Sequence, residues 1–94
     1  MQNNLAQDTT YNGWTNYETW RVNLEMIDGD DHASENDFDA YDLGQHLREM
    51  VEGVVSEQAE GLALDYALAF LDAVNWREIA QHQIDAYRTE ETVN

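Results

Sequence analysis

Carboxylates and imidazoles are the side chains of this sequence that could do chemistry. His46 and Glu49 lie three residues apart, and Glu78 and His82 lie four apart, so each pair would share one face of a helix. Two such pairs on facing helices could hold a metal ion, as in carboxylate-bridged bundles. The helical patterns described below place both pairs on solvent faces. We therefore predict no metal centre there and no cofactor.

The segment from Asp28 to Asp39 begins like a calcium-binding loop. Asp28, Asp30 and His32 alternate as the first ligands of such a loop would. Its sixth position, however, is Ala33 where these loops need glycine, and its twelfth is Asp39 where they use glutamate. We expect loose cation condensation on this segment and no specific calcium site.

Nucleophilic catalysis has little support in the sequence. Ser34 and Ser56 are the only serines, neither has a base at a motif spacing, and there is no cysteine. With so many acidic residues, a pair of carboxylates is uninformative about acid–base chemistry. We predict that the protein is not an enzyme.

The charge balance is the strongest feature of the composition. Twenty acidic residues face four arginines and no lysine, which gives a formal net charge of −16. Because 43% of the 94 residues are hydrophobic and 11% aromatic, the chain has the composition of a folded domain and not of a disordered acidic tail. Its field would repel DNA, RNA and anionic membranes. Two interpretations stay open: a surface shaped for a basic partner, or the salt adaptation of a halophile.

Nothing in the sequence predicts export or membrane insertion. The first ten residues, MQNNLAQDTT, are polar and lack the basic and apolar regions of a secretory signal. No apolar run approaches the roughly 20 residues that a membrane span needs. We expect a cytoplasmic protein.

Helical periodicity indicates an all-α fold. A capping-box spacing from Thr15 to Glu18 predicts a first helix over about residues 16–28, ended by Gly29. A second helix is predicted from Asp37 or Asp39 to about residue 59, with Gly61 as its stop. The apolar stripes of these two helices are Tyr17, Trp20, Leu24 and Ile27, and Leu43, Leu47, Met50, Val51 and Val54.

The last two helices complete a predicted four-helix domain. Residues 62–74, LALDYALAFLDAV, are apolar nearly all round, which is typical of the buried centre of a bundle. Asn75 is the predicted cap of a fourth helix lined by Trp76, Ile79, Ala80, Gln83 and Tyr87. We expect a polar flexible arm over residues 1–13, one helical domain over 14–88 with an acidic loop between its first two helices, and a frayed tail over 89–94.

Two short blocks carry a family resemblance. The string NGWTNYETW, residues 12–20, resembles the N-terminal signature of small acidic proteins found on bacteriophage genomes and mobile elements. The string VNWREIA, residues 74–80, is similar to the C-terminal block of the same group. The resemblance implies a genomic setting and a suspected anti-defence role, and it assigns no functional residue.

The acidic surface and this resemblance together predict a DNA mimic. B-form DNA carries roughly one charge per 1.7 Å, so 16 net charges match about 27 Å of duplex, which is also about the length of a helix from Asp42 to Glu60. We expect an anti-defence protein in the host cytoplasm that blocks the nucleic-acid-binding surface of a CRISPR–Cas complex, or of a restriction enzyme, without binding nucleic acid or membranes itself. The expected contact residues are Asp30, Asp31, Asp37, Asp39, Tyr41, Asp42, Glu49, Glu52 and Glu60.

Three questions stay open at this stage. The alternative function is a halophile-type structural or adaptor protein whose charge serves solubility only. The sequence also leaves open a homodimer. An aromatic anchor for the partner is expected among Tyr41, Tyr11 and Trp14, because bare carboxylates give little specificity.

Overall fold

A computed structural model describes the backbone of residues 9–29 and 39–93, and the side chains of these residues up to Arg88. In chain order it contains α1 (Tyr17–Val22), the π-helical segment η1 (Asn23–Ile27), α2 (Ala40–Gln58), α3 (Gly61–Asp72) and α4 (Trp76–Val93). Over the described ranges, helices are the regular structure, with one isolated bridge between Tyr11 and Trp14. The predicted all-α domain of four helices is confirmed.

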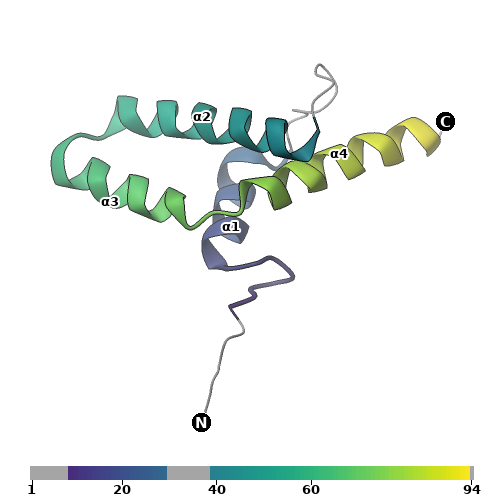
Figure 1. Ribbon diagram of the computed structural model, residues 1–94, viewed down its shortest axis with the longest axis horizontal. Coiled ribbons are helices and arrows are strands. Elements are labelled where there is room, and N and C mark those ends of the chain that lie inside the picture. Colours follow the sequence, from purple (N-terminus) through teal and green to yellow (C-terminus); the bar gives the residue numbers. More distant parts are fainter. Residues whose placement is uncertain (1–8, 30–38, 94) are drawn as a thin grey trace, which may run out of the picture.

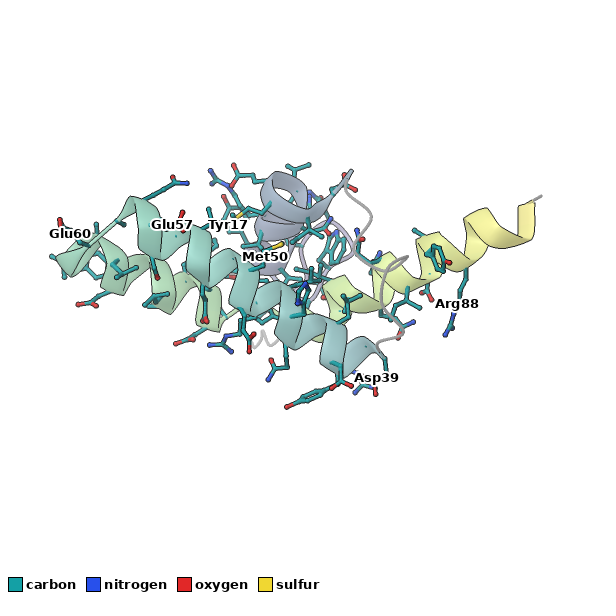
Figure 2. All side chains as sticks on the ribbon, turned by 90° about the horizontal axis from the view of Figure 1, so that it is seen from above. Tyr17, Asp39, Met50, Glu57, Glu60 and Arg88 are labelled. Atoms are coloured by element: carbon teal, nitrogen blue, oxygen red, sulfur yellow. The ribbon has the colours of Figure 1, made fainter. Side chains whose placement is uncertain are left out.

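α2 and α3 form a hairpin, α4 extends from it, and α1 with η1 crosses the other helices. α2 and α3 run antiparallel, and α4 leads away from α3 past the first half of α2 (Figure 1). The most extensive packing joins α2 to α4. Seen from above, α1 and η1 lie on one side of the layer that the other three helices make (Figure 2). The tip of the α2–α3 hairpin, residues 57–61, projects beyond α1.

A tight turn precedes α1. Tyr11 and Trp14 exchange two backbone hydrogen bonds of 2.9 and 2.8 Å. Asn12 and Gly13 between them have φ values of 48° and 87°, as a two-residue turn of this hand requires. The Trp14 ring then stacks on His82 of α4 at 4.1 Å between centroids. The last residues of the predicted arm therefore belong to the fold, while residues 1–8 lie outside the described part.

The cap of α1 is Asn16, one residue later than predicted. Its Oδ1 accepts a hydrogen bond from Thr19 N at 2.9 Å, which satisfies one of the unpaired donors of the first turn. The Thr15 hydroxyl instead accepts a hydrogen bond from Asn75 Nδ2 at 3.2 Å. The prediction of Thr15 as cap was wrong because this contact with a distant residue engages its side chain.

The predicted first helix divides into α1 and a wider π-helical turn. Asp28 N donates to Asn23 O at 2.7 Å, a hydrogen bond over five residues that is characteristic of a π-helix. Asp28 is then extended, and Gly29 has a φ of 93°, the left-handed conformation predicted for it.

Side-chain hydrogen bonds join the starts of α1 and α4. Asn75 N donates to Thr19 Oγ1 at 2.9 Å, and this hydroxyl donates to Asn16 Oδ1 at 2.6 Å. Asn16 Nδ2 in turn donates to the carbonyl of Ala73 at 2.8 Å. Thr19 is fully buried, so its hydroxyl connects the two helix starts inside the protein.

The cap of α4 completes this arrangement. Asn75 Oδ1 accepts a hydrogen bond from Glu78 N at 3.0 Å, which confirms Asn75 as the predicted cap. In a capping box the Glu78 carboxylate would return to Asn75 N. Here it accepts a hydrogen bond from Thr15 N at 3.0 Å, across 63 residues of sequence. We call this set the cap network: Thr15, Asn16, Thr19, Ala73, Asn75 and Glu78.

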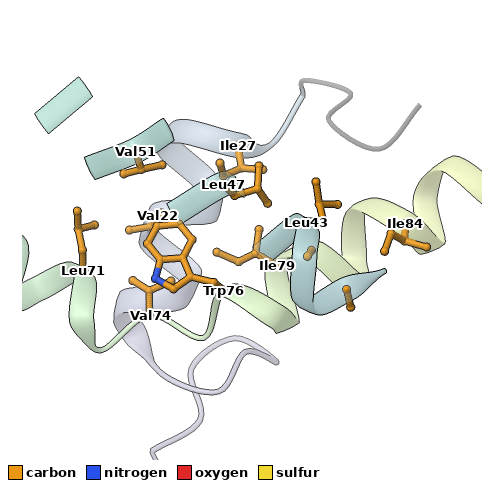
Figure 3. Close-up of a cluster of buried hydrophobic side chains, with 12 residues drawn as sticks. Val22, Ile27, Leu43, Leu47, Val51, Leu71, Val74, Trp76, Ile79 and Ile84 are labelled. Atoms are coloured by element: carbon orange, nitrogen blue, oxygen red, sulfur yellow. The ribbon is translucent and has the colours of Figure 1, made fainter. Parts of the chain in front are cut away.

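The hydrophobic core lies where α2 meets α4, η1 and the end of α3 (Figure 3). Leu43, Leu47 and Val51 of the predicted α2 stripe are buried, and Met50 is half-buried. Val54 is 37% exposed, because the end of α2 projects beyond α1. The core residues are Val22, Ile27, Ala40, Leu43, Leu47, Val51, Leu71, Val74, Trp76, Ile79, Ala80 and Ile84.

The buried face of α1 and η1 differs from the prediction. Thr19, Val22 and Ile27 are buried, whereas Trp20 is half-buried and Leu24 is 52% exposed. The π-helical turn accounts for the change at Leu24, since its wider turn rotates Ile27 toward the face that Val22 buries. Trp20 contacts the Tyr11 ring at the surface, with centroids 4.9 Å apart. Its predicted place in the core was wrong.

α3 is not the buried centre of the domain. Within it only Leu71 is buried, while Leu62 is 65% exposed and Tyr66 is 71% exposed. The helix packs against α2 in a hairpin that projects past the other elements, so one side of α3 is left uncovered. The all-round apolar pattern therefore led to a wrong prediction of burial.

The ends of three helices can be compared with their predicted positions. α2 begins after Asp39, one of the two predicted starts, and the Asp39 side chain accepts a hydrogen bond from Asp42 N at 2.8 Å. Gly61, with a φ of 62°, opens α3 instead of ending α2. α4 continues to Val93, beyond the predicted end of the domain at residue 88.

Gly44 permits the close approach of α2 and α4. A Cβ at this position would lie 3.0 Å from the Trp76 carbonyl oxygen and 3.1 Å from its carbon. Alanine would gain about 1 kcal/mol of helix propensity, but overpacking against backbone costs about 1–3 kcal/mol. We expect Gly44→Ala to lower the free energy of unfolding, measured by urea denaturation.

Gly53 offers the matched control, because it lies in the same helix and a Cβ there would meet nothing within 4 Å. Gly53→Ala should raise the free energy of unfolding by roughly 0.5–1 kcal/mol. Equal stabilisation by both substitutions would contradict the close approach of the two helices.

The cap network predicts that valine substitutions at Thr19 and Thr15 will lower stability by different amounts. Thr19→Val keeps the shape of a buried side chain but leaves Asn75 N without its acceptor, which costs about 1–3 kcal/mol. Thr15→Val removes one hydrogen bond at an exposed site and should cost less than about 1 kcal/mol. Thermal and urea unfolding would measure both, and equal effects would show that the network adds no specific stability.

Candidate partner-binding surface

Carboxylates on the outer face of α2, opposite Leu43 and Leu47, form the best-described part of the predicted site. Asp42 and Glu49 are both exposed and lie two turns apart, roughly 10 Å along the axis. Neither takes part in an ion pair with another described residue. Both therefore present negative charge to solvent, and Asp39 at the helix start is exposed as well, although one of its carboxylate oxygens accepts the cap hydrogen bond from Asp42 N.

Glu52 differs from these residues because it is paired. Arg48 Nε donates to Glu52 Oε2 at 2.9 Å, and Arg48 Nη2 donates to Asp72 Oδ1 at 2.6 Å. The hydrogen bond to Glu52 is the main cause that raises the pKa of Arg48 above its usual value. Arg48 thus joins α2 to the end of α3 and offsets the charge of Glu52. This makes Glu52 the least phosphate-like of the described carboxylates.

The remaining predicted contacts do not form one patch. Glu60 is exposed at the tip of the α2–α3 hairpin, and Asp39 lies at the opposite end of α2 (Figure 2). Asp30, Asp31 and Asp37 lie outside the described residues. The described part of the site therefore extends along the whole of α2 instead of concentrating at one point.

Tyr41 is the exposed aromatic residue nearest the carboxylates of α2. Its side chain is 62% exposed, and its hydroxyl accepts a hydrogen bond from Gln45 Nε2 at 3.4 Å. The other two candidates for an anchor are less accessible: Tyr11 is 39% exposed and Trp14 is half-buried against His82. Among the three, Tyr41 is best placed to contact a partner.

The histidine–carboxylate pairs do not converge. Among the described residues no three histidine or acidic side chains gather as metal ligands would. Glu78 belongs to the cap network, and His82 is covered on one face by Trp14. The calcium-like loop lies outside the described residues apart from Asp28, Gly29 and Asp39.

An apolar groove, which the sequence analysis did not predict, lies between α1, η1, the end of α2 and α3. Its volume is about 410 Å³. The lining residues are Arg21, Val22, Glu25, Met26, Val55, Tyr66, Ala67, Phe70 and Leu71. The sequence did carry a signal for it, because a helix that is apolar on every side but only partly covered must leave an apolar face exposed.

The charges at the rim of this groove neutralise each other. Arg21 Nε contacts Glu25 Oε1 at 3.1 Å, and Arg21 Nη1 donates to the Tyr17 hydroxyl at 2.7 Å. The hydrogen bond to Glu25 is the main cause that raises the pKa of Arg21. The groove therefore offers apolar surface, with its one cation already engaged.

The fold and these surfaces define a small all-α acidic domain with an open apolar groove. The chain belongs to a family of unknown function, DUF7249, whose model matches residues 7–93. The match includes both sequence blocks, the cap network and the groove. No curated protein and no solved structure matches the chain. None of the described helices is long and apolar enough to cross a membrane.

The charge distribution predicts how stability depends on salt. Three ion pairs engage Arg21 and Arg48, while most described carboxylates face solvent. Screening shortens from about 30 Å at 0.01 M salt to about 8 Å at 0.15 M, so it should relieve more repulsion than it removes attraction. We expect the melting temperature to rise over this range. A flat response would contradict strong repulsion in the fold, and a further rise up to molar salt would favour salt adaptation.

Proposed function

We propose that the protein is a phage or mobile-element inhibitor of host defence. It binds the basic nucleic-acid-binding surface of a defence complex, a CRISPR–Cas effector first and a restriction enzyme second, and so excludes DNA from it. On this proposal it acts in the host cytoplasm as a binding protein and not as an enzyme.

The observation that carries the proposal is the charge left uncompensated after folding. Asp39, Asp42 and Glu49 along α2 take part in none of the ion pairs between described residues. Holding like charges on one rigid helix disfavours the compact state, and a basic partner would relieve that cost on binding. The family model supports membership of a group and is silent on this role.

The protein would bind its basic partner much as DNA binds a basic protein, with this protein in the place of the DNA. The partner's lysines and arginines would meet carboxylates on α2 in place of phosphates, with faster encounter at low salt. Because carboxylates confer little specificity, Tyr41 would supply an aromatic contact beside them.

A double substitution tests the acidic face of α2. Asp42→Asn with Glu49→Gln removes two charges that take part in no described ion pair, so the fold should hold or become slightly more stable. We expect roughly three- to tenfold slower association with the basic complex and a shallower salt dependence. The measurement is competition with duplex DNA for that complex at two salt concentrations.

The matched control is Asp28→Asn with Asp65→Asn. It makes the same change of net charge at two exposed residues, one after η1 and one on α3. If both double variants compete equally well, total charge and not the α2 face determines binding. If the unmodified protein fails to compete with DNA for any basic defence complex, the proposed function is wrong.

A further inference from the structure

The apolar groove continues along an exposed face of α3. Tyr66 lines the groove and is 71% exposed, and Leu62, one turn earlier on the same helix, is 65% exposed. On the other side, Met26 and Val22 come from η1 and α1. A continuous apolar surface bordered by two helical segments has the shape that accepts a third helix.

The groove has the size and chemistry of a binding site. Its volume of about 410 Å³ lies within the range of roughly 300–1,000 Å³ that is usual for ligand pockets. Val55, Phe70 and Leu71 supply apolar atoms from α2 and α3. Tyr17 packs edge-on against Phe70, with ring centroids 6.4 Å apart, so the Phe70 ring of the groove is held in place.

Electrostatics indicate what kind of helix would fit. The cation at the rim, Arg21, is engaged by Glu25 and by the Tyr17 hydroxyl. Glu57 and Glu60 are exposed at the hairpin tip, where α2 leads into α3 (Figure 2). An anionic ligand, or a second copy of a chain with net charge −16, would be repelled here, whereas a cationic helix would be attracted.

We propose that this groove binds a cationic amphipathic helix of the partner protein. Apolar side chains spaced three and four residues apart on that helix would enter the groove beside Tyr66 and Phe70. Its lysines or arginines would lie toward Glu57 and Glu60. This inference rests on the proposed function, because it names the part of the basic partner that the protein holds and adds an apolar anchor to the acidic contacts of α2.

A model peptide tests the groove without the natural partner. The probe is a synthetic 18-residue helix of leucine and lysine, with leucine on one face, labelled for fluorescence anisotropy. We expect the unmodified protein to bind it. Tyr66→Ser with Leu62→Ser should weaken binding about tenfold or more, because exposed aromatic anchors dominate such contacts.

Two controls separate the groove from simple charge attraction. Leu24→Ser replaces an exposed apolar side chain, 52% exposed, on η1 and outside the groove lining, and should change the affinity less than about twofold. A peptide of the same composition with leucine scattered around the helix should bind at least about tenfold more weakly. Equal binding of both peptides, or equal losses in the Tyr66 and Leu24 variants, would overturn the proposal.

Two further measurements distinguish other outcomes. Sedimentation equilibrium that showed a dimer, lost in the Tyr66 variant, would identify the groove as a contact between copies and overturn the proposal. With a captured defence complex, full DNA competition by the Tyr66 and Leu62 double variant would refute the groove and leave the proposed function standing. Peptide binding through Tyr66 by a protein that never competes with DNA would refute the function and leave the groove.

Discussion

The hydrogen bonds between the starts of α1 and α4 are the constraint on which the rest of the structure depends. α1 has six residues, far fewer than the 12–15 or so at which an isolated helix becomes even marginally stable. Its first turn is satisfied by Asn16, and Asn16 is fixed by Thr19 and by the Ala73 carbonyl. These partners are separated by more than 50 residues, so neither helix start is complete until the chain has returned from the α2–α3 hairpin. α1 and η1 also form one side of the groove, whose shape therefore depends on the same bonds.

The cap network also explains the two sequence blocks that carry the family resemblance. Thr15, Asn16 and Thr19 come from the first block, and Asn75 and Glu78 come from the second. Residues of the two blocks are hydrogen-bonded to each other, so a structural role explains why these residues occur there. Surfaces available to a partner lie between the blocks in sequence, on α2 and α3.

Most local signals were read correctly from the sequence, apart from the roles assigned to Thr15 and Gly61, whereas long-range packing was largely missed. The caps at Asp39 and Asn75 and the left-handed Gly29 depend on neighbouring residues, and each was predicted. Leu24, Val54 and the outer face of α3 were assigned to the core because periodicity identifies an apolar stripe without identifying what covers it. Of the candidate site, the exposure of Tyr41, Asp42 and Glu49 followed from the α2 pattern. The pairing of Glu52 through Arg48 with Asp72, and the groove, require knowledge of how the α2–α3 hairpin closes.

The exposed apolar face of α3 has a consequence for the colloidal behaviour of the protein. Near neutral pH the large negative charge keeps copies apart, so Leu62 and Tyr66 can face water without bringing molecules together. The isoelectric point is about 4.1, where protonation of carboxylates removes this repulsion while the apolar face stays unchanged. Acidification thus converts the same surface from a tolerated exposure into an adhesive one, so the acidic residues protect solubility in addition to the partner contacts proposed for them.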